Sequence, residues 1–500
     1  MKTNMHYYAL ALLLLMSCGG NKESSTKDEA LLENSEDSIT LNISYQIPGD
    51  LPADASEEEL AKFAWNEFFA LNWASSWPND QKRATPNTSW KFAGSGPAPG
   101  VAVWETYIHR TELRPANGKR TRSLTSGKPY YTFINPVDTT TNNVALSDYW
   151  VNLDEDNEIG SAYVFAYDST EVLYMAKSNL VEYTYVKNNF PTDSLLKIAV
   201  DNGTDPSLSY LKKVTQEGAT CNSDTASHVI CLPCGSDTEE GTIEIKTAWR
   251  FLLNGKDDPS RFITKSVVYY TEENGLPTAH TGTMGLIGMH IIRKTQNYPS
   301  FIFASWEQLD VRNADMQTIG LDTPLVNNMP DPNVDPHQLE PVVPRNIPAT
   351  LQSVNTEAHN LITSQNPESL WQYYQLIGVQ GIPVDYTNKG QDDNYFMANY
   401  VIESDSLLTV FHGSFADPFN ASLQNVVYKG ESYNMGGCQG CHGQAQIGGT
   451  DFSFLLDFGA GKPVPQPDLL LTVDEALENA NPSQIKNYVE KFEQIITSKQ

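Results

Sequence analysis

The strongest constraint in this 500-residue sequence is the run Cys438-Gln439-Gly440-Cys441-His442 near its carboxyl end. Two thiols separated by two residues can each form a thioether with one vinyl group of a haem, and the histidine that follows can then ligate the iron. The spacing therefore predicts one covalent haem c, attached through Cys438 and Cys441. His442 is the predicted proximal ligand of the haem iron.

Two other chemistries use paired cysteines. A Cys-x-x-Cys pair can be a redox disulfide, or it can supply half of a zinc site. A zinc site usually needs a second pair of ligands nearby, and no Cys or His follows His442 in the sequence. The haem interpretation is therefore favoured over both alternatives.

The sixth ligand of such an iron has to come from upstream, because the 58 residues after His442 contain no Met or His. A Met ligand raises the reduction potential relative to His, whereas an open coordination site permits ligand chemistry. The sequence leaves a protein ligand, a water molecule and an open site as alternatives. The candidate protein ligands are Met289, His290, His359, Met397 and His412.

The amino-terminal residues resemble an export signal. Lys2 precedes an apolar run from Tyr7 to Met16, which is too short to span a bilayer as a helix but suits the apolar core of a signal peptide. Leu15-Met16-Ser17-Cys18-Gly19 resembles the lipobox of bacterial lipoproteins. The resemblance implies that residues 1–17 are removed and that Cys18 is lipidated. We therefore expect a bacterial envelope protein, held by lipid in the outer membrane and facing the periplasm or the outside.

Charge restricts the partners. Lys and Arg number 33 against 61 Asp and Glu, a formal net charge of −28 that becomes −29 once Lys2 is removed with the signal. Such a surface repels phosphate backbones, which argues against nucleic-acid binding, and it favours a basic redox partner protein. Residues 18–45 are rich in Ser, Glu and Asp, and are predicted to form a flexible tether between lipid and globule.

A second cysteine cluster lies mid-chain, and an odd number of thiols remains there once lipid and haem take the other three. One disulfide with a leftover thiol is the favoured interpretation in an oxidising compartment. A tetrahedral metal site and a redox motif at Cys231-Leu232-Pro233-Cys234 stay open. The residues of the cluster are Cys221, His228, Cys231 and Cys234.

The predicted fold class is α+β. Residues 46–323 are predicted to form a strand-rich domain that begins with a helix after the capping box at Ser56–Glu59. Seven prolines between Pro324 and Pro348 predict a linker over 324–348, and residues 349–500 are predicted to be mainly helical and to carry the haem. Within these regions, strands are expected over 262–271 and 301–306, and helices over 284–295, 349–363 and 368–376.

Several stretches together resemble a family of large bacterial proteins with a single c-type haem motif, usually labelled only as cytochrome c family proteins. The resemblance covers about four-fifths of the chain, implies haem attachment at Cys438, Cys441 and His442, and implies no particular reaction. The stretches are FAWNEFFALNW (63–73), VWETY (103–107), KTAWR (246–250), MGLIGMHIIRKT (284–295), FASWEQLD (303–310), WQYYQLIG (371–378) and GGCQGCHGQAQ (436–446) with DFSFLL (451–456).

Three functions fit these features. An electron-transferring, lipid-anchored c-type cytochrome is favoured. The first alternative is a haem-dependent oxidoreductase, because a domain of some 280 residues exceeds what one electron carrier needs and can bind a small substrate or a second cofactor. The second alternative is a non-catalytic surface-binding lipoprotein in which the haem is structural.

Overall fold

The fold is taken from a computed structural model of the chain. It describes residues 39–77, 79–80, 82–113, 162–166, 172–205, 228–235, 239–252, 255, 257–273, 276–311, 316–320, 347–384, 399, 401–402 and 426–456. All of these residues belong to a single unit of contacts. Helices and antiparallel sheet are both present, so the predicted α+β class is confirmed.

The strands form one large sheet and two small ones. The seven-stranded sheet has the order β1-β3-β4-β6-β7-β9, and β5 also pairs with β6. All its pairings are antiparallel. Its strands are β1 (Ile108–His109), β3 (Leu173–Ser178), β4 (Ile243–Phe251), β5 (Thr264–Glu273), β6 (Leu276–Arg293), β7 (Ile302–Gln308) and β9 (Tyr374–Gln380). The small sheets pair β2 (Ala162–Ala166) with β8 (Met316–Gly320), and β10 (Val426–Tyr428) with β11 (Glu431–Tyr433).

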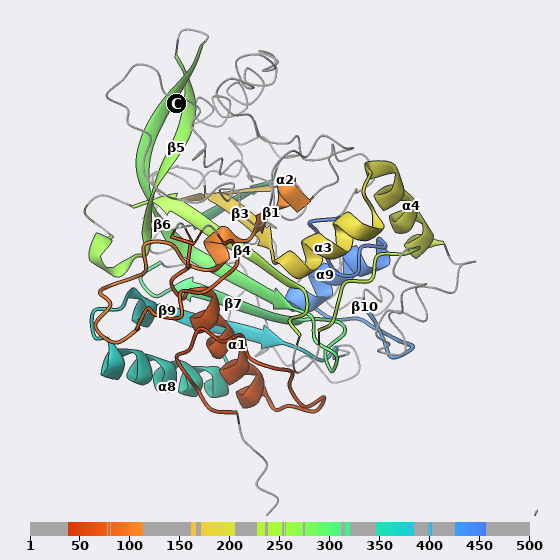
Figure 1. Cartoon of the computed structure of the whole chain (residues 1–500), viewed down its shortest axis with the longest axis horizontal. Helices are drawn as coiled ribbons and strands as arrows, with labels where there is room; N and C mark the ends of the chain where they lie inside the picture. The colour runs from red at the N-terminus through yellow and green to blue at the C-terminus, as the bar shows by residue number, and fades with distance from the viewer. Residues whose placement is uncertain are drawn as a thin grey trace, which may run out of the picture. The chain divides into compact units, whose positions relative to one another are not determined.

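Helices cover both faces of the large sheet (Figure 1). The α-helices are α1 (Glu57–Leu71), α2 (Arg110–Leu113), α3 (Leu180–Asn189), α4 (Asp193–Thr204), α8 (Ala349–Gln365) and α9 (Gly437–Ile447). The 3-10 helices are η1 (Trp104–Thr106), η2 (Pro259–Arg261) and η5 (Leu370–Tyr373). The predicted capping box is confirmed at the start of α1, since Glu59 N donates to Ser56 Oγ and Ser56 N donates to the Glu59 carboxylate.

One face of the sheet carries an aromatic core beneath α1 and α8, which lie side by side (Figure 1). Trp65 and Phe68 of α1 meet Trp306 of β7, with ring centroids 6.3 and 5.4 Å apart. Phe69 stacks on Trp371 at 5.9 Å. We call these residues and their apolar neighbours the aromatic face. Burial of large aromatic rings makes it the main source of hydrophobic stabilisation.

The opposite face packs against α3 and α9. Side chains alternate between the two faces along each strand, so the neighbours of the aromatic residues point to this second side. Glu244, Lys246, His290, Phe303 and Gln380 all lie here by strand register. This second side is the polar face, because buried charged and amide groups accompany its apolar residues.

The predicted helix over 284–295 is wrong: these residues belong largely to the long strand β6, which ends at Arg293. β6 lies between β4 and β7 and is buried on both faces, so its apolar residues form a continuous run instead of an alternating one. Such a run cannot be told from a buried helix by periodicity alone.

Three of the other element predictions hold, and one fails. The strands over 262–271 and 301–306 are confirmed as β5 and β7, and the helix over 349–363 as α8. The expected helix over 368–376 is wrong, because η5 is followed directly by β9. β9 pairs with β7, so the residues before and after the proline-rich segment contribute to the same sheet. The described part of 349–500 contains both helices and strands.

Candidate functional site

The Cys-x-x-Cys-His run lies on α9, which is fixed to the edge strand β9. Gln439 N donates to Gln380 Oε1 at 2.8 Å, and Gln380 Nε2 donates to the Gly436 carbonyl at 3.2 Å. At Gly437 φ is +71°, and a Cβ atom there would lie 2.3 Å from Gln380 Nε2. Only glycine combines that backbone conformation with this close approach. The start of α9 is therefore positioned by contacts with Gln380, a residue outside the Cys-x-x-Cys-His run.

Cys438 and Cys441 are three residues apart, so their side chains share one face of α9. They are 5% and 4% exposed and belong to the same apolar cluster as Phe303 and Phe452. Both keep their thiols, since neither is in a disulfide. The helix therefore presents two thiols and, one residue later, an imidazole to one apolar region.

His442 is oriented by a backbone carbonyl. Its Nδ1 lies 2.6 Å from the Phe452 carbonyl oxygen, which can only accept, so Nδ1 carries the proton and Nε2 keeps a lone pair. Loss of solvation lowers the pKa of His442 to about 4, against the opposing effect of the Phe452 carbonyl. The rings of Phe303 and Phe454 flank the imidazole at 4.9 and 4.7 Å. A neutral imidazole with a fixed Nδ1–H is the form in which histidine binds a metal through Nε2.

The carbonyl that orients His442 sits on a strained turn. Asp451 and Phe452 have φ angles of +53° and +70°, a region that costs a non-glycine residue energy. The Asp451 carboxylate holds the turn, because it accepts hydrogen bonds from Leu232 N at 2.6 Å and from the Lys294 ammonium. Desolvation raises the pKa of Asp451 in spite of Lys294. The turn after α9 is thus held by residues more than 150 positions away in sequence.

Two buried glutamates lie beside the same turn. Glu244 of β4 shares hydrogen bonds with Glu182 of α3 and with Ser453, the residue after Phe452. Burial raises the pKa of Glu244 to about 7 and that of Glu182 well above its usual value. Because two carboxylates in contact cannot both ionise at low cost, the pair holds at least one proton at neutral pH.

Only some of the predicted sixth-ligand candidates lie on the polar face. His290 of β6 is there. Met289, the next residue in the strand, points to the aromatic face, where Asn72 Nδ2 lies 3.8 Å from its sulfur. His359 of α8 is also on that side, with Nε2 2.7 Å from the Tyr374 carbonyl oxygen. Met397 and His412 lie outside the described residues.

The mid-chain cysteines take different states. Cys231 is in a disulfide, and Tyr185 Oη accepts its backbone N–H at 2.9 Å. Cys234 keeps a free, buried thiol, whose pKa burial raises. His228 is exposed, and Cys221 lies outside the described residues. Within the described ranges no group of three or more His, Cys, Asp or Glu side chains could hold a metal ion. The states of Cys231 and Cys234 match a disulfide with a leftover thiol.

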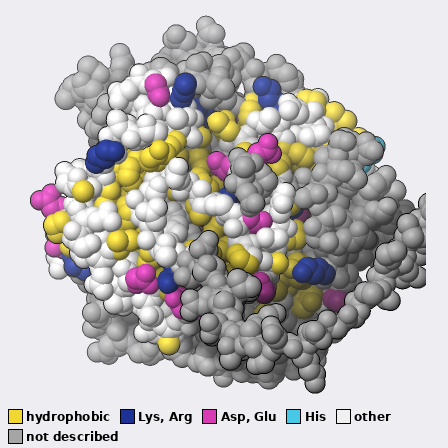
Figure 2. Space-filling view, turned by 60° about the horizontal axis from the view of Figure 1, so that its bottom comes forward, with side chains coloured by type: hydrophobic (Ala, Val, Ile, Leu, Met, Phe, Trp, Pro, Cys, Tyr) yellow, Lys and Arg dark blue, Asp and Glu magenta, His cyan; other side chains and the backbone are white. Residues whose placement is uncertain are grey.

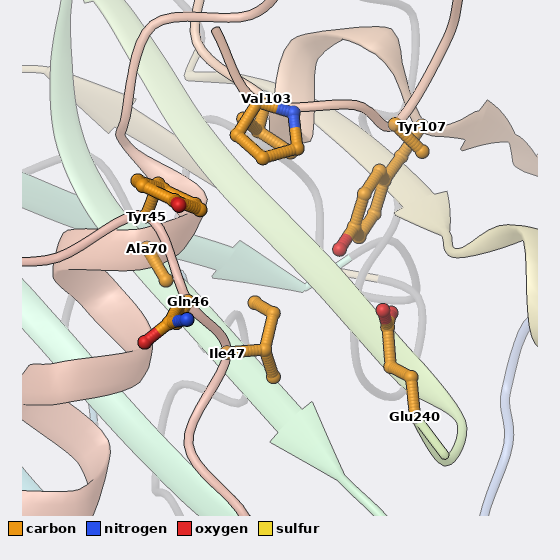
Figure 3. Close-up of a pocket in the computed structure, with 9 residues that line it drawn as sticks. Tyr45, Gln46, Ile47, Ala70, Val103, Tyr107 and Glu240 are labelled. Atoms are coloured by element: carbon orange, nitrogen blue, oxygen red, sulfur yellow. The ribbon is translucent and has the colours of Figure 1, made fainter. Parts of the chain in front are cut away.

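A cavity of about 420 Å³ lies beside α1. Figure 3 shows the Tyr107 hydroxyl and the Glu240 carboxylate pointing toward one another at its edge. They are hydrogen-bonded, and Asn179 Nδ2 donates to Glu240 at 2.6 Å. Glu67 and Arg293 are buried close by, with a nitrogen–oxygen distance of 3.6 Å. Burial raises the pKa of Glu67 to about 7. The cavity is of a size suited to a small ligand.

On the face shown in Figure 2, the Lys and Arg side chains of the described residues stand apart from one another instead of gathering into a patch. None of the helices in the described ranges combines the length and hydropathy needed for a membrane span. Cys18, the signal and most of the tether lie outside those ranges.

Sequence reasoning missed the groups that support His442. Glu182, Glu244, Lys294 and Asp451 were not singled out, although charged residues inside the apolar runs of β4 and β6 are a usable signal: a buried charge needs a partner. No protein-family model, curated protein or solved structure matches this chain.

Proposed function

We propose that this chain is a lipid-anchored c-type cytochrome of the bacterial envelope that carries one covalent haem and transfers electrons. The observation that carries the proposal is the geometry of α9: two thiols on one helix face, and a neutral His442 whose Nδ1–H is held by the Phe452 carbonyl. A bound haem would supply one-electron chemistry at its iron.

The residues of the chain have separate roles in this proposal. Cys438 and Cys441 attach the macrocycle, and His442 ligates the iron through Nε2. Asp451 and Lys294 position the carbonyl that fixes the histidine tautomer, which keeps the lone pair directed at the metal. Cys18 anchors the chain by lipid, and the net charge of −28 favours a basic partner protein.

The test is the haem content of full-length protein produced in a bacterial envelope. We expect one haem per chain by pyridine haemochrome assay, and a covalent increment of one haem in the intact mass. Cys438→Ala with Cys441→Ala should lose the increment, whereas Cys234→Ala, which alters a buried thiol outside α9, should keep it. Wild-type protein without covalent haem would overturn the proposal.

A second candidate, a haem-dependent oxidoreductase, is favoured by the cavity at Tyr107 and Glu240 (Figure 3). Anaerobic mixing with small amines, polyols and hydroxy acids tests it, with haem reduction as the readout. Reduction by one class that is lost in Glu240→Gln would support an enzyme. Equal behaviour of wild type and variant would favour the carrier.

A further inference from the structure

His290 occupies a defined place on the polar face. It pairs with Lys246 of β4 on one side and with Ser305 of β7 on the other. It is 8% exposed in the middle of the sheet. Its strand neighbours Met289 and Ile291 belong to the aromatic face, so alternation directs the His290 side chain to the side that packs against α9.

Phe303 connects His290 to His442. On β7, Phe303 lies two residues before Ser305, the partner of His290, so Phe303 and His290 are diagonal neighbours on one face. Diagonal neighbours lie within reach of large side chains. The Phe303 ring is 4.9 Å from the His442 ring. Two histidines from segments about 150 residues apart are therefore brought to one apolar region.

The environment keeps His290 neutral. Desolvation, followed by the charges of Lys246 and His442, lowers its pKa to about 3. Neutral imidazole is the form that ligates iron.

We propose that His290 would be the second protein ligand to hold the haem iron, together with His442. The proposal rests on the haem function proposed above and sharpens it. It gives a six-coordinate, bis-histidine iron. Such a site has no open position for substrate, and its potential lies below that of a His–Met site. The chain would then be an electron carrier and not a ligand-activating enzyme.

The experiment compares wild type with His290→Ala in the full-length holoprotein. Optical and electron paramagnetic resonance spectra report the spin state, and carbon monoxide binding to the reduced protein reports an open site. We expect a low-spin wild type that does not bind carbon monoxide. In His290→Ala we expect a high-spin iron that binds it, with covalent haem content unchanged.

Three further measurements separate ligation from a structural role. Added imidazole should restore the low-spin spectrum of His290→Ala, and His290→Met should raise the midpoint potential. Met289→Leu, the adjacent residue on the opposite face, should keep the wild-type spectrum. A high-spin wild type, or a low-spin His290→Ala without added imidazole, would overturn His290 as ligand while leaving the haem in place. Absence of haem from wild type would instead overturn the proposed function.

Discussion

The two faces of the seven-stranded sheet differ in what they bury. The aromatic face packs large rings, with Trp65, Phe68 and Trp306 fully buried beneath α1 and α8. Its polar groups include Asn355, which satisfies the indole N–H of Trp65 at 3.0 Å, and the buried pair of Glu67 and Arg293. This is the composition of a face that stabilises the fold by burial of apolar area.

The polar face instead buries several charged groups, namely Glu182, Glu244, Lys294 and Asp451. Each buried charge costs desolvation free energy that apolar residues of similar volume would avoid. Yet these groups gather around the turn that positions the Phe452 carbonyl against His442. The difference shows that the two faces of one sheet have different roles. Burial on the aromatic face stabilises the fold, and this stability offsets the desolvation cost of the charged groups that position His442 on the polar face.

The largest effect is expected from the aromatic face. Phe68→Ala removes a ring that meets Trp306, Trp371 and Tyr374, and it should lower the free energy of unfolding by about 3–5 kcal/mol. The spectrum of the proposed haem should not change in the folded protein. Urea unfolding of holoprotein measures the first quantity. Leu195→Ala on α4, where the side chain is 43% exposed, is the control and should change stability by less than about 0.5 kcal/mol.

An altered haem spectrum in folded Phe68→Ala would contradict the division of tasks between the faces.

The polar face is tested by its buried ion pair. Lys294→Met leaves the Asp451 carboxylate buried without its cation, which should cost about 3 kcal/mol. The loss should stay at the lower end of the usual range because Asp451, whose pKa burial already raises, can take up a proton. The midpoint potential of the proposed haem should shift as well, since the carbonyl that orients His442 is on the same turn.

The double variant Lys294→Met, Asp451→Asn is the matched control. It removes both charges, and asparagine tolerates the φ angle of +53° at position 451. Its unfolding free energy should exceed that of Lys294→Met alone. An equal or lower value would show that the pair is not what holds the turn.

The smallest effect is a change in pH dependence. Burial raises the pKa of Glu244 to about 7 from its usual 4.5, so the folded state holds a proton that the unfolded state releases. Stability from this group is full below pH 4.5 and is lost as the pH rises through 7. Glu244→Gln should remove this loss, on the order of 2 kcal/mol between pH 5 and pH 8, because each pKa unit corresponds to about 1.4 kcal/mol.

Urea midpoints at the two pH values measure the effect, and Glu431→Gln on exposed β11 is the control. A variant that keeps the wild-type slope would show that Glu244 is already ionised in the folded protein.

Local signals predicted the parts of the fold that local interactions determine. The capping box located the start of α1 within one residue, since both of its hydrogen bonds join residues three apart. The prediction of a helix over 284–295 failed for a physical reason. Both faces of β6 are buried, so its apolar residues form a run interrupted by Gly285 and Gly288, and this spacing resembles that of a helix. The prediction of a helix over 368–376 failed because β7, the strand that pairs with β9, lies about 70 residues away in sequence.

The residues of the candidate site also fall into two groups: those that local sequence predicts and those that only the fold brings together. The Cys438, Cys441 and His442 run is contiguous, so the sequence alone identifies it. His290 was a candidate but was assigned to a helix, and only the strand register places it on the side of α9. Lys294 and Asp451 are 157 residues apart, and no spacing rule predicts such a contact.

Burial of the two thiols on α9 has a consequence for biogenesis. At 5% and 4% exposure, Cys438 and Cys441 are out of reach of any attachment enzyme once the helix is docked on β9. If they carry the macrocycle, as proposed, ligation has to precede folding, while the newly exported polypeptide is still open. A chain that folds before ligation can then no longer receive the macrocycle. The yield of mature protein therefore depends on the rate of attachment relative to the rate of folding.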